Sequence, residues 1–530
     1  MKKVLFLTLG LIISFSCSQR PGDMIMINTP ISFATVIIKT EAGKVESTLR
    51  LSKLSIQVEI VGNIVTTTMD MSFYNDLDRI LEGTLNFPLE NEQVVSRFAM
   101  EVNGDLREGV VVEKAKGRRV FEEIVRRKVD PGLLEMTKGN NFRARVYPIP
   151  AKGNKRIVIS YEEELDMNET AWSYRLPLGF QEKVASFSLD INIKKQVQRP
   201  QLIAASFPDF NFKANKSGGY KATFEAKNFL PDQSIEVRIP FPKSDKHFVM
   251  TEKVGKETYF YLHTRLTPIV KKAPKPKEIT LAWDVSESSK GRDIDKELAL
   301  LDQYFKRLEN AKIELVEFSN TVHNASIFNL KGGNWLELKT KIQGLTYDGG
   351  TQLGSINLKK YKSDLVILVT DGLTTFGKSK LAFAQTPIIT LNSSKSANEA
   401  YLKYISQVSG GKYIDLNHTK IGNLTTALTN ESYQFINATY DGKKITSTYP
   451  NIVMPVHNQF SLAGVLKNET AKITLNFGIG NNVFHTETIE INATKNASKF
   501  DIQRLWAKKK VNVLNMQSEL STPAKIVKQN

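Results

Sequence analysis

Short side chains that carry oxygen stand in three separate segments, each next to an apolar run typical of a buried strand. The segments are Trp283-Asp-Val-Ser-Glu-Ser-Ser289, Tyr347-Asp-Gly-Gly-Thr351 and Leu365-Val-Ile-Leu-Val-Thr-Asp-Gly372. Mg²⁺ takes oxygen ligands in a near-octahedral shell and keeps positions for water or for a partner's carboxylate. The sequence therefore predicts a site for Mg²⁺, or for another divalent cation such as Mn²⁺ or Ca²⁺. Its candidate ligands are Asp284, Ser286, Ser288, Thr351 and Asp371.

The spacing within these segments favours convergence at one edge of a sheet. The polar residues of Asp284-Val-Ser-Glu-Ser288 lie two residues apart, in a loop that leaves the predicted strand Glu278–Trp283. Gly349 and Gly350 allow a sharp bend before Thr351. Open α/β sheets bind ligands at the carboxyl ends of their parallel strands, and we expect all three segments there.

Strands that alternate with helices predict a doubly wound α/β domain over residues 278–430. One apolar stripe at helical spacing comprises Ile294, Leu298, Leu301, Phe305 and Leu308. A second helix is predicted over Ala397–Val408 and a last strand over Lys412–Leu416. Only Gln352–Ser363 separates Thr351 from the next strand, so the helix between them must be shortened or lost. Without a full helix after it, we expect Thr351 to be held less firmly in position.

The three segments, in this order, resemble the von Willebrand factor type A domain and its metal-ion-dependent adhesion site. The resemblance implies that Ser286 and Ser288 bind the cation directly, and that Thr351 binds it directly or through water. It implies that Asp284 and Asp371 act partly through water, and that a protein ligand supplies an acidic residue to complete the shell. The alternative interpretation is that all five are ordinary turn residues or helix caps.

Residues 33–165 resemble the domain shared by vault proteins and inter-alpha-trypsin inhibitor heavy chains, the VIT domain. The resemblance rests on Asn75-Asp76, Glu82–Leu89, Lys114–Ile124, Asp130–Glu135, Phe142–Pro150 and Ile157–Tyr161. It implies a β-sandwich-like fold followed by a type A domain, a pair that is extracellular in the heavy chains. Within this region a helix is predicted over Val112–Lys128. Its basic residues form either a solvated face, which we favour, or an anion-binding face.

The remaining segments are predicted to be mostly strand. Residues 166–270 form either a separate sandwich or an extension of the first domain, and residues 271–277 form a basic linker. Residues 431–497 are β-rich, and residues 498–530 contain a helix over Phe500–Val511 and a polar tail. The family resemblance implies that β-structure on both sides of the type A domain combines into one module. The expected fold class is multidomain α+β.

The amino terminus predicts export and lipid attachment. Lys2-Lys3 precede the apolar run Val4–Phe15, which is typical of a signal peptide and too short to span a membrane. Cys17, the only cysteine, stands where bacterial lipoproteins are cleaved and acylated. Residues 1–17 are thus a predicted lipoprotein signal peptide, and residues 18–32 a linker. We expect the protein to cross the inner membrane and to be lipid-anchored in the bacterial cell envelope. Ser18, rather than Asp, after the cysteine favours the outer membrane.

Composition limits the remaining function classes. The net charge of +17 favours acidic surfaces, polyanions or anionic lipid head groups, although most of the excess is scattered Lys. We expect no nucleic-acid partner, because no compact basic-aromatic module is present. The six histidines are scattered, and the phosphate-cradling and nucleophile-elbow motifs are absent, so we expect no enzyme.

These observations predict a cell-envelope lipoprotein that mediates metal-dependent protein binding or adhesion through a type A domain. One alternative is a scaffold for envelope assembly that uses no metal. A weaker alternative is a hydrolase with its active site in the β regions.

Overall fold

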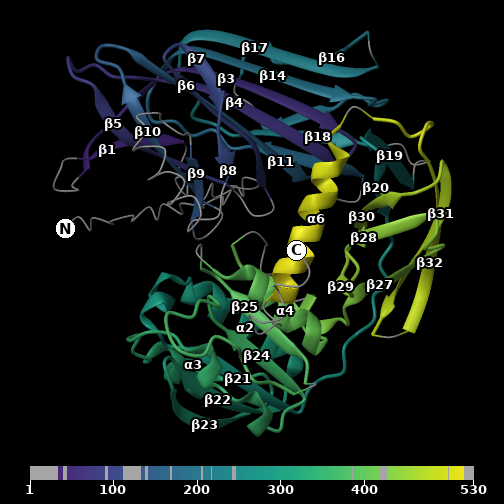
Figure 1. The fold of residues 1–530 in the computed structure, drawn as a ribbon. Helices are drawn as coiled ribbons and strands as arrows, with labels where there is room; N and C mark the ends of the chain where they lie inside the picture. The colour runs from purple at the N-terminus through teal and green to yellow at the C-terminus, as the bar shows by residue number, and fades with distance from the viewer. Residues whose placement is uncertain are drawn as a thin grey trace, which may run out of the picture.

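A computed structural model gives the fold of residues 34–518 (Figure 1), apart from 40–44, 90–92, 112–132, 138–140, 168–169, 205–206, 217, 242–245, 385, 395–396, 418–426, 481 and 499. The predicted signal peptide, Cys17, the 18–32 linker, the helix Val112–Lys128 and the last twelve residues of the tail lie outside the described residues. Strands account for 53% of the structure and helices for 14%, so the chain is more β than the expected α+β class. Among the described residues, no helix is long and apolar enough to cross a bilayer.

The first module is built from three sheets around one core. One sheet has the order β2-β1-β5-β10-β9-β8, a second has β16-β17-β14-β3-β4-β11-β6-β7, and a third has β12-β13-β18-β15. Their bounds are β1 (Thr35–Lys39), β2 (Val45–Thr48), β3 (Arg50–Val61), β4 (Ile64–Tyr74), β5 (Leu81–Pro88), β6 (Val94–Val102), β7 (Asp105–Glu108), β8 (Val110–Val111), β9 (Leu133–Thr137), β10 (Asn141–Ile149), β11 (Asn154–Glu164), β12 (Asp166–Met167), β13 (Ala171–Leu176), β14 (Val184–Lys194), β15 (Gln201–Ala204), β16 (Lys213–Ala214), β17 (Gly219–Phe229) and β18 (Ile235–Pro240).

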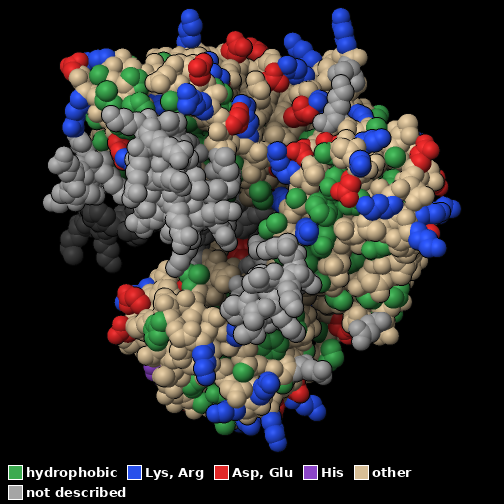
Figure 2. Space-filling view, viewed as in Figure 1, with side chains coloured by type: hydrophobic (Ala, Val, Ile, Leu, Met, Phe, Trp, Pro, Cys, Tyr) green, Lys and Arg blue, Asp and Glu red, His purple; other side chains and the backbone are tan. Residues whose placement is uncertain are grey.

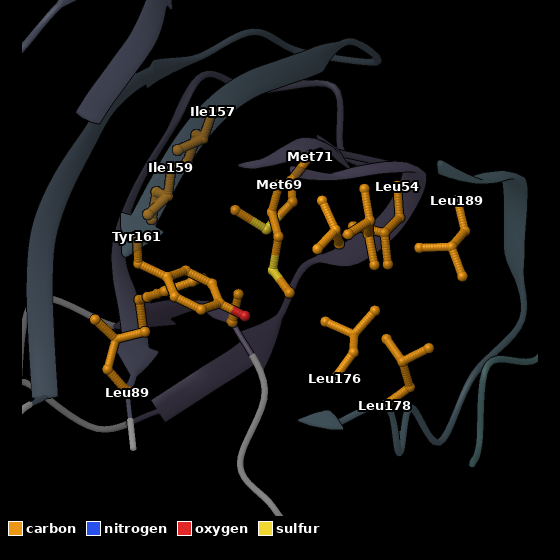
Figure 3. Close-up of a cluster of buried hydrophobic side chains, with 14 of the residues drawn as sticks. Leu54, Met69, Met71, Leu89, Ile157, Ile159, Tyr161, Leu176, Leu178 and Leu189 are labelled. Carbon is orange, nitrogen blue, oxygen red and sulfur yellow. The ribbon is translucent and has the colours of Figure 1, made fainter. Parts of the chain in front are cut away.

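Alternating apolar residues explain why these sheets pack. Leu54, Ile56, Val58 and Ile60 of β3 are buried, with more exposed residues between them, as expected for a strand with one face in a core. Figure 3 shows side chains of β3, β4, β11, β13 and β14 meeting in this core. Strand β14 pairs in parallel with β3, in the register Leu189 to Ile56. The stretch after residue 166 therefore continues the first sheet system instead of forming a sandwich of its own.

Strands from both sides of the central domain combine into a second β module. Strand β20 (Glu257–Arg265) pairs with β30 (Gln459–Leu466) in the register Phe260 to Gly464. The sheet β19-β20-β30-β28 packs against the sheet β29-β27-β31-β32 over a core that includes Phe260, Phe435 and Phe477. The other bounds are β19 (His247–Val254), β27 (Tyr433–Tyr440), β28 (Ile445–Tyr449), β29 (Met454–Pro455), β31 (Thr470–Ile479) and β32 (Asn482–Asn492).

A doubly wound α/β domain is inserted between these two sets of strands. Its sheet has the order β23-β22-β21-β24-β25-β26, parallel except for the antiparallel edge strand β23. Its chain ends leave side by side, since Ala273 N donates to Thr429 O at 2.9 Å and Glu431 N to Lys271 O at 2.7 Å. The bounds are β21 (Glu278–Asp284), α2 (Ile294–Leu308), β22 (Ala311–Phe318), β23 (Val322–Leu330), α3 (Leu336–Gln343), β24 (Leu365–Val369), β25 (Ile388–Asn392), α4 (Glu399–Ser409) and β26 (Lys412–Asp415).

The two faces of this sheet are covered differently. Helices α2 and α3 pack on one face, where Phe305 and Leu338 meet Leu281 and Ile367 of the sheet. On the other face α4 shares the cover with irregular chain, including the short 3-10 turns Leu353–Ser355 and Leu358–Lys360. The predicted loss of a helix after Thr351 is thus confirmed.

The C-terminal helix α6 (Ile502–Ser518) connects all three parts and is longer than the predicted Phe500–Val511. It lies against β20 and β30 and also contacts α4 (Figure 1). Its Lys509 Nζ lies 2.8 Å from Glu164 Oε1, at the end of β11. The Tyr261 hydroxyl donates to Glu164 Oε2 at 3.0 Å, and the Ser461 hydroxyl donates to the same oxygen. This buried network joins the first module, the second module and α6.

The stabilising contacts that Glu164 makes between the modules depend on pH. Burial alone raises the pKa of Glu164, but the ammonium groups of Lys509 and Lys508 outweigh it and hold the pKa at about 2. Because this pKa lies below the ordinary value of 4.5, the carboxylate stabilises the fold above pH 4.5. We expect that contribution, on the order of 3 kcal/mol, to be lost as the pH falls toward 2.

Glu164→Gln is expected to lower the melting temperature at pH 7 and to reduce its decline between pH 5 and pH 3. Scanning calorimetry of the full chain measures both effects, and the exposed Glu225→Gln serves as the matched control. An unchanged melting curve for Glu164→Gln contradicts the proposed role of this carboxylate.

Candidate functional site

The five predicted ligands all lie at the carboxyl edge of the central sheet. Asp284 is the last residue of β21, and Asp371 follows β24 by two residues. These strands are neighbours, with Trp283 opposite Val369. The chain order of the sheet reverses between them, because β22 follows β21 on one side while β24 lies on the other. Open α/β sheets bind ligands at such a reversal point.

Three hydroxyl groups converge above this point. Ser286 Oγ lies 3.2 Å from Ser288 Oγ, and Ser288 Oγ lies 3.5 Å from Thr351 Oγ1. The Ser288 hydroxyl is also close enough to the Asp371 carboxylate to lower the pKa of that carboxyl. Ser286 and Thr351 are fully buried, while Ser288 is half-buried. The structure therefore brings Ser286, Ser288, Thr351 and Asp371 together as one group of oxygen atoms, with Ser288 at its centre.

Asp284 supports this group from below. Its Oδ1 accepts the backbone N–H of Ser286 at 2.9 Å, and its Oδ2 accepts the hydroxyl of Thr370 at 2.6 Å. Both oxygens have a protein donor and the side chain is fully buried. This geometry orients the loop that carries Ser286, and it suits a carboxylate that reaches a cation through water. Thr370 was missed by the sequence analysis, although it directly precedes Asp371.

Asp371 lies in an environment that disfavours its charge. Burial raises the pKa of its carboxyl, and the nearby carboxylate of Asp284 raises it further, while the N–H of Leu373, 2.9 Å from Oδ1, lowers it. Two carboxylates and three hydroxyls within one buried group form a hard oxygen donor set, which fits Mg²⁺. A divalent cation would offset the repulsion between the two carboxylates.

Thr351 is held without the helix that its position usually precedes. Thr375 N donates to Thr351 O at 3.0 Å, and Thr351 N donates to Thr375 Oγ1 at 2.9 Å. Gly350 has no room for a side chain, because a Cβ atom there would overlap the Phe376 ring and Thr375 Oγ1. The N–H of Glu287 donates to Gly349 O at 2.9 Å and joins the first segment to the second. The hydrogen bonds from Thr375 and Glu287 replace the missing helix in positioning Thr351.

Arg292 connects the ends of the two central strands, and the sequence analysis did not identify it. Its Nη1 donates to the carbonyl oxygens of Asp284 at 3.0 Å and Val369 at 3.1 Å. Its Nε lies 3.0 Å from Glu297 Oε1, and both side chains are fully buried. The hydroxyl of Ser393 donates to the same Glu297 oxygen at 2.6 Å. Burial raises the pKa of Glu297, and the Arg292 charge opposes that rise.

Comparisons with known proteins identify the first domain and its relatives. Residues 51–161 match the family model described as the Vault protein inter-alpha-trypsin domain. A von Willebrand factor A domain-containing protein of Dictyostelium discoideum is 21% identical over 58% of this chain and 35% of its own length. Inter-alpha-trypsin inhibitor heavy chain H3 of Pongo abelii is 23% identical over 60% of this chain and 39% of its own length. The matches thus cover little more than a third of either relative.

These matches confirm the predicted resemblance: residues 51–161 match the VIT domain, and the chain is similar to a von Willebrand factor A domain-containing protein and to an inter-alpha-trypsin inhibitor heavy chain. Among solved structures, the ArnB paralog VWA2 of Sulfolobus acidocaldarius is 14% identical over 52% of this chain and 82% of its own. Its TM-score of 0.26 is too low to compare the two folds as wholes. The lipoprotein part of the expectation stays a prediction.

Removal of Arg292 is expected to destabilise the central domain strongly. Arg292→Met leaves the Glu297 carboxylate buried without its partner, which costs about 3 to 5 kcal/mol. The double variant Arg292→Met, Glu297→Met removes both charges and is expected to recover most of that loss. Urea unfolding followed by tryptophan fluorescence measures each variant, with the exposed Arg307→Met as control. Equal stability of the single and double variants contradicts this account.

Proposed function

We propose that this protein binds a protein partner through a divalent cation held at the carboxyl edge of its type A domain. The observation that carries the proposal is the convergence of Ser286, Ser288 and Thr351 with Asp371 around the half-buried Ser288 hydroxyl. Three loops that are distant in sequence are held there by specific hydrogen bonds. An ordinary set of turn residues or caps needs no such convergence.

The proposed roles follow from what each side chain already contacts. Ser286, Ser288 and Thr351 supply hydroxyl ligands, because their oxygens lie within 3.5 Å of a neighbouring hydroxyl in the group. Asp284 and Asp371 supply negative charge and act partly through water, because Asp284 has both oxygens engaged by protein donors. An acidic side chain of the partner completes the shell. The protein then acts by binding and carries out no catalysis.

The proposed location is the bacterial cell envelope. Acylation of Cys17 after removal of the signal peptide would attach the chain to a membrane surface, most simply the outer membrane. The first module would then connect the lipid anchor to the type A domain. A metal-free scaffold is the competing proposal, and the connection of all three parts by α6 favours it over the hydrolase.

Mg²⁺ is expected to bind and to raise the melting temperature of the type A domain, because a ligand that binds only the folded state stabilises it. Ser288→Ala is expected to weaken Mg²⁺ binding at least tenfold, and Asp284→Ala to abolish it. Isothermal calorimetry and thermal melting with and without EDTA measure these effects. Asp295→Ala, an exposed acid on α2, serves as the control. Identical Mg²⁺ responses in Asp284→Ala and the control would refute the metal site.

A further inference from the structure

Two irregular segments leave the candidate metal site and run side by side over one face of the central sheet. The first, residues 352–363, begins after Thr351, and the second, residues 372–384, begins after Asp371. Gly354 N donates to Lys378 O at 2.8 Å, and Leu358 N donates to Ala382 O at 2.7 Å. Leu353 and Leu381 bury their side chains in the core beneath. The pair therefore forms a fixed surface that is continuous with the site.

This surface carries an unbalanced positive charge. No Asp or Glu occurs from Gly349 to Ser363, or from Gly372 to Asn398. Five exposed lysines lie on the two segments. Lys362 stands at the far end of the first segment, near β24, and the other four are Lys359, Lys360, Lys378 and Lys380. Within the described part of the chain, none of these four forms an ion pair with an acid. We call these four residues the lysine strip.

Many lysines elsewhere on the same domain are paired. Lys290 Nζ lies 2.7 Å from Glu287, and Lys306 Nζ lies 2.7 Å from Asp302. Lys341 Nζ lies 2.9 Å from Glu317. On the upper part of the face that Figure 2 shows, over the first β module, Lys and Arg side chains are interspersed with Asp and Glu. The lysine strip is therefore a local excess of charge beside the site, and not part of the general scatter of lysines.

An exposed aromatic ring stands between the metal site and the lysine strip. Phe376 is 51% exposed, although phenylalanine is usually buried. Its ring lies against Gly350, next to Thr351, and a Cβ atom on Gly350 would overlap it. The chain continues from Phe376 through Gly377 to Lys378. An apolar contact, a cation position and a row of ammonium groups thus follow one another along one surface.

We infer that the partner presents an acidic protein segment in which an apolar side chain lies beside the metal-binding carboxylate and further acids follow. This inference rests on the proposed function and specifies the partner's chemistry. The carboxylate completes the cation's shell, the apolar side chain packs on Phe376, and the further acids pair with the lysine strip. A simple polyanion would use the lysines alone. Phe376 and the single cation position therefore favour a peptide segment over a polyanion or a lipid surface.

Charge complementarity between the lysine strip and an acidic partner mainly affects recognition and the rate of association. The test uses the full mature chain and a fluorescein-labelled peptide, Gly-Phe-Asp-Glu-Asp-Glu-Gly, in Mg²⁺ buffer at low salt. Replacement of the lysine strip by Glu at all four positions is expected to weaken peptide binding at least tenfold in fluorescence polarisation. The same variant keeps its Mg²⁺ affinity or binds Mg²⁺ more tightly, because added negative charge attracts a cation.

A matched control reverses four exposed lysines far from the site in sequence: Lys331, Lys443, Lys472 and Lys495. It changes the net charge equally, and both affinities are expected to stay within twofold of the wild type. Phe376→Ala is expected to weaken the peptide about fivefold and to leave Mg²⁺ binding unchanged. A peptide in which Phe is replaced by Gly is expected to bind wild type and Phe376→Ala equally.

The outcomes separate this inference from the proposed function. If wild type binds no Mg²⁺, the proposed function fails. If it binds Mg²⁺ but the strip variant and the control bind the peptide equally well, only the present inference fails. Polyglutamate, heparin and phosphatidylglycerol vesicles serve as competing probes. The present inference also fails if one of them binds as tightly as the peptide and keeps that affinity both in EDTA and with Phe376→Ala. The lysine strip would then be assigned to polyanions or lipid.

Discussion

The buried ion pair of Arg292 and Glu297 fixes the two strand ends on which the candidate site is built. Arg292 donates to the last carbonyl oxygens of β21 and β24, so the loops that follow these strands start from one rigid base. Removal of two charges from water is costly, and the pair is sustained because Ser393 and Ser289 satisfy further polar atoms. The positions of Asp284 and Asp371 therefore depend on a contact that binds no ligand itself.

Much of the central domain is predictable from the sequence because its signals are local. The apolar runs Glu278–Trp283 and Leu365–Val369 each form a strand, and both faces of each strand are buried, as in other parallel sheets. The absence of a helix after Thr351 follows from the length of the intervening chain. Thr370 was not predictable, because its partner Asp284 lies 86 residues away. The bridging role of Arg292 was not predictable either, because one of its two carbonyl partners, Val369, lies 77 residues away. No local pattern marks an arginine that binds two carbonyl oxygens.

The β modules are harder to predict because their decisive contacts are distant in sequence. Alternation indicated strands over much of residues 166–270, yet it did not indicate that β14 pairs with β3, about 130 residues earlier. Likewise the apolar side of α6 was predicted from Ile502 and Leu505, which are buried. The ion pair between Lys509 of α6 and Glu164 was not predicted, because a lysine on a helix is ordinarily solvated. Periodicity shows which face of an element is buried and does not show what covers it.

The pairing of β20 with β30 has a consequence for biogenesis. The two strands are separated by the whole inserted α/β domain, whose own ends meet at Ala273 and Thr429. During synthesis from the amino terminus, β20 therefore has no partner on its β30 side until nearly two hundred further residues have been made. Unfinished edges are prone to pair with other chains. Early and independent folding of the inserted domain would bring residues 271 and 431 together. The effective loop between β20 and β30 would then be shorter, and its closure would cost less entropy.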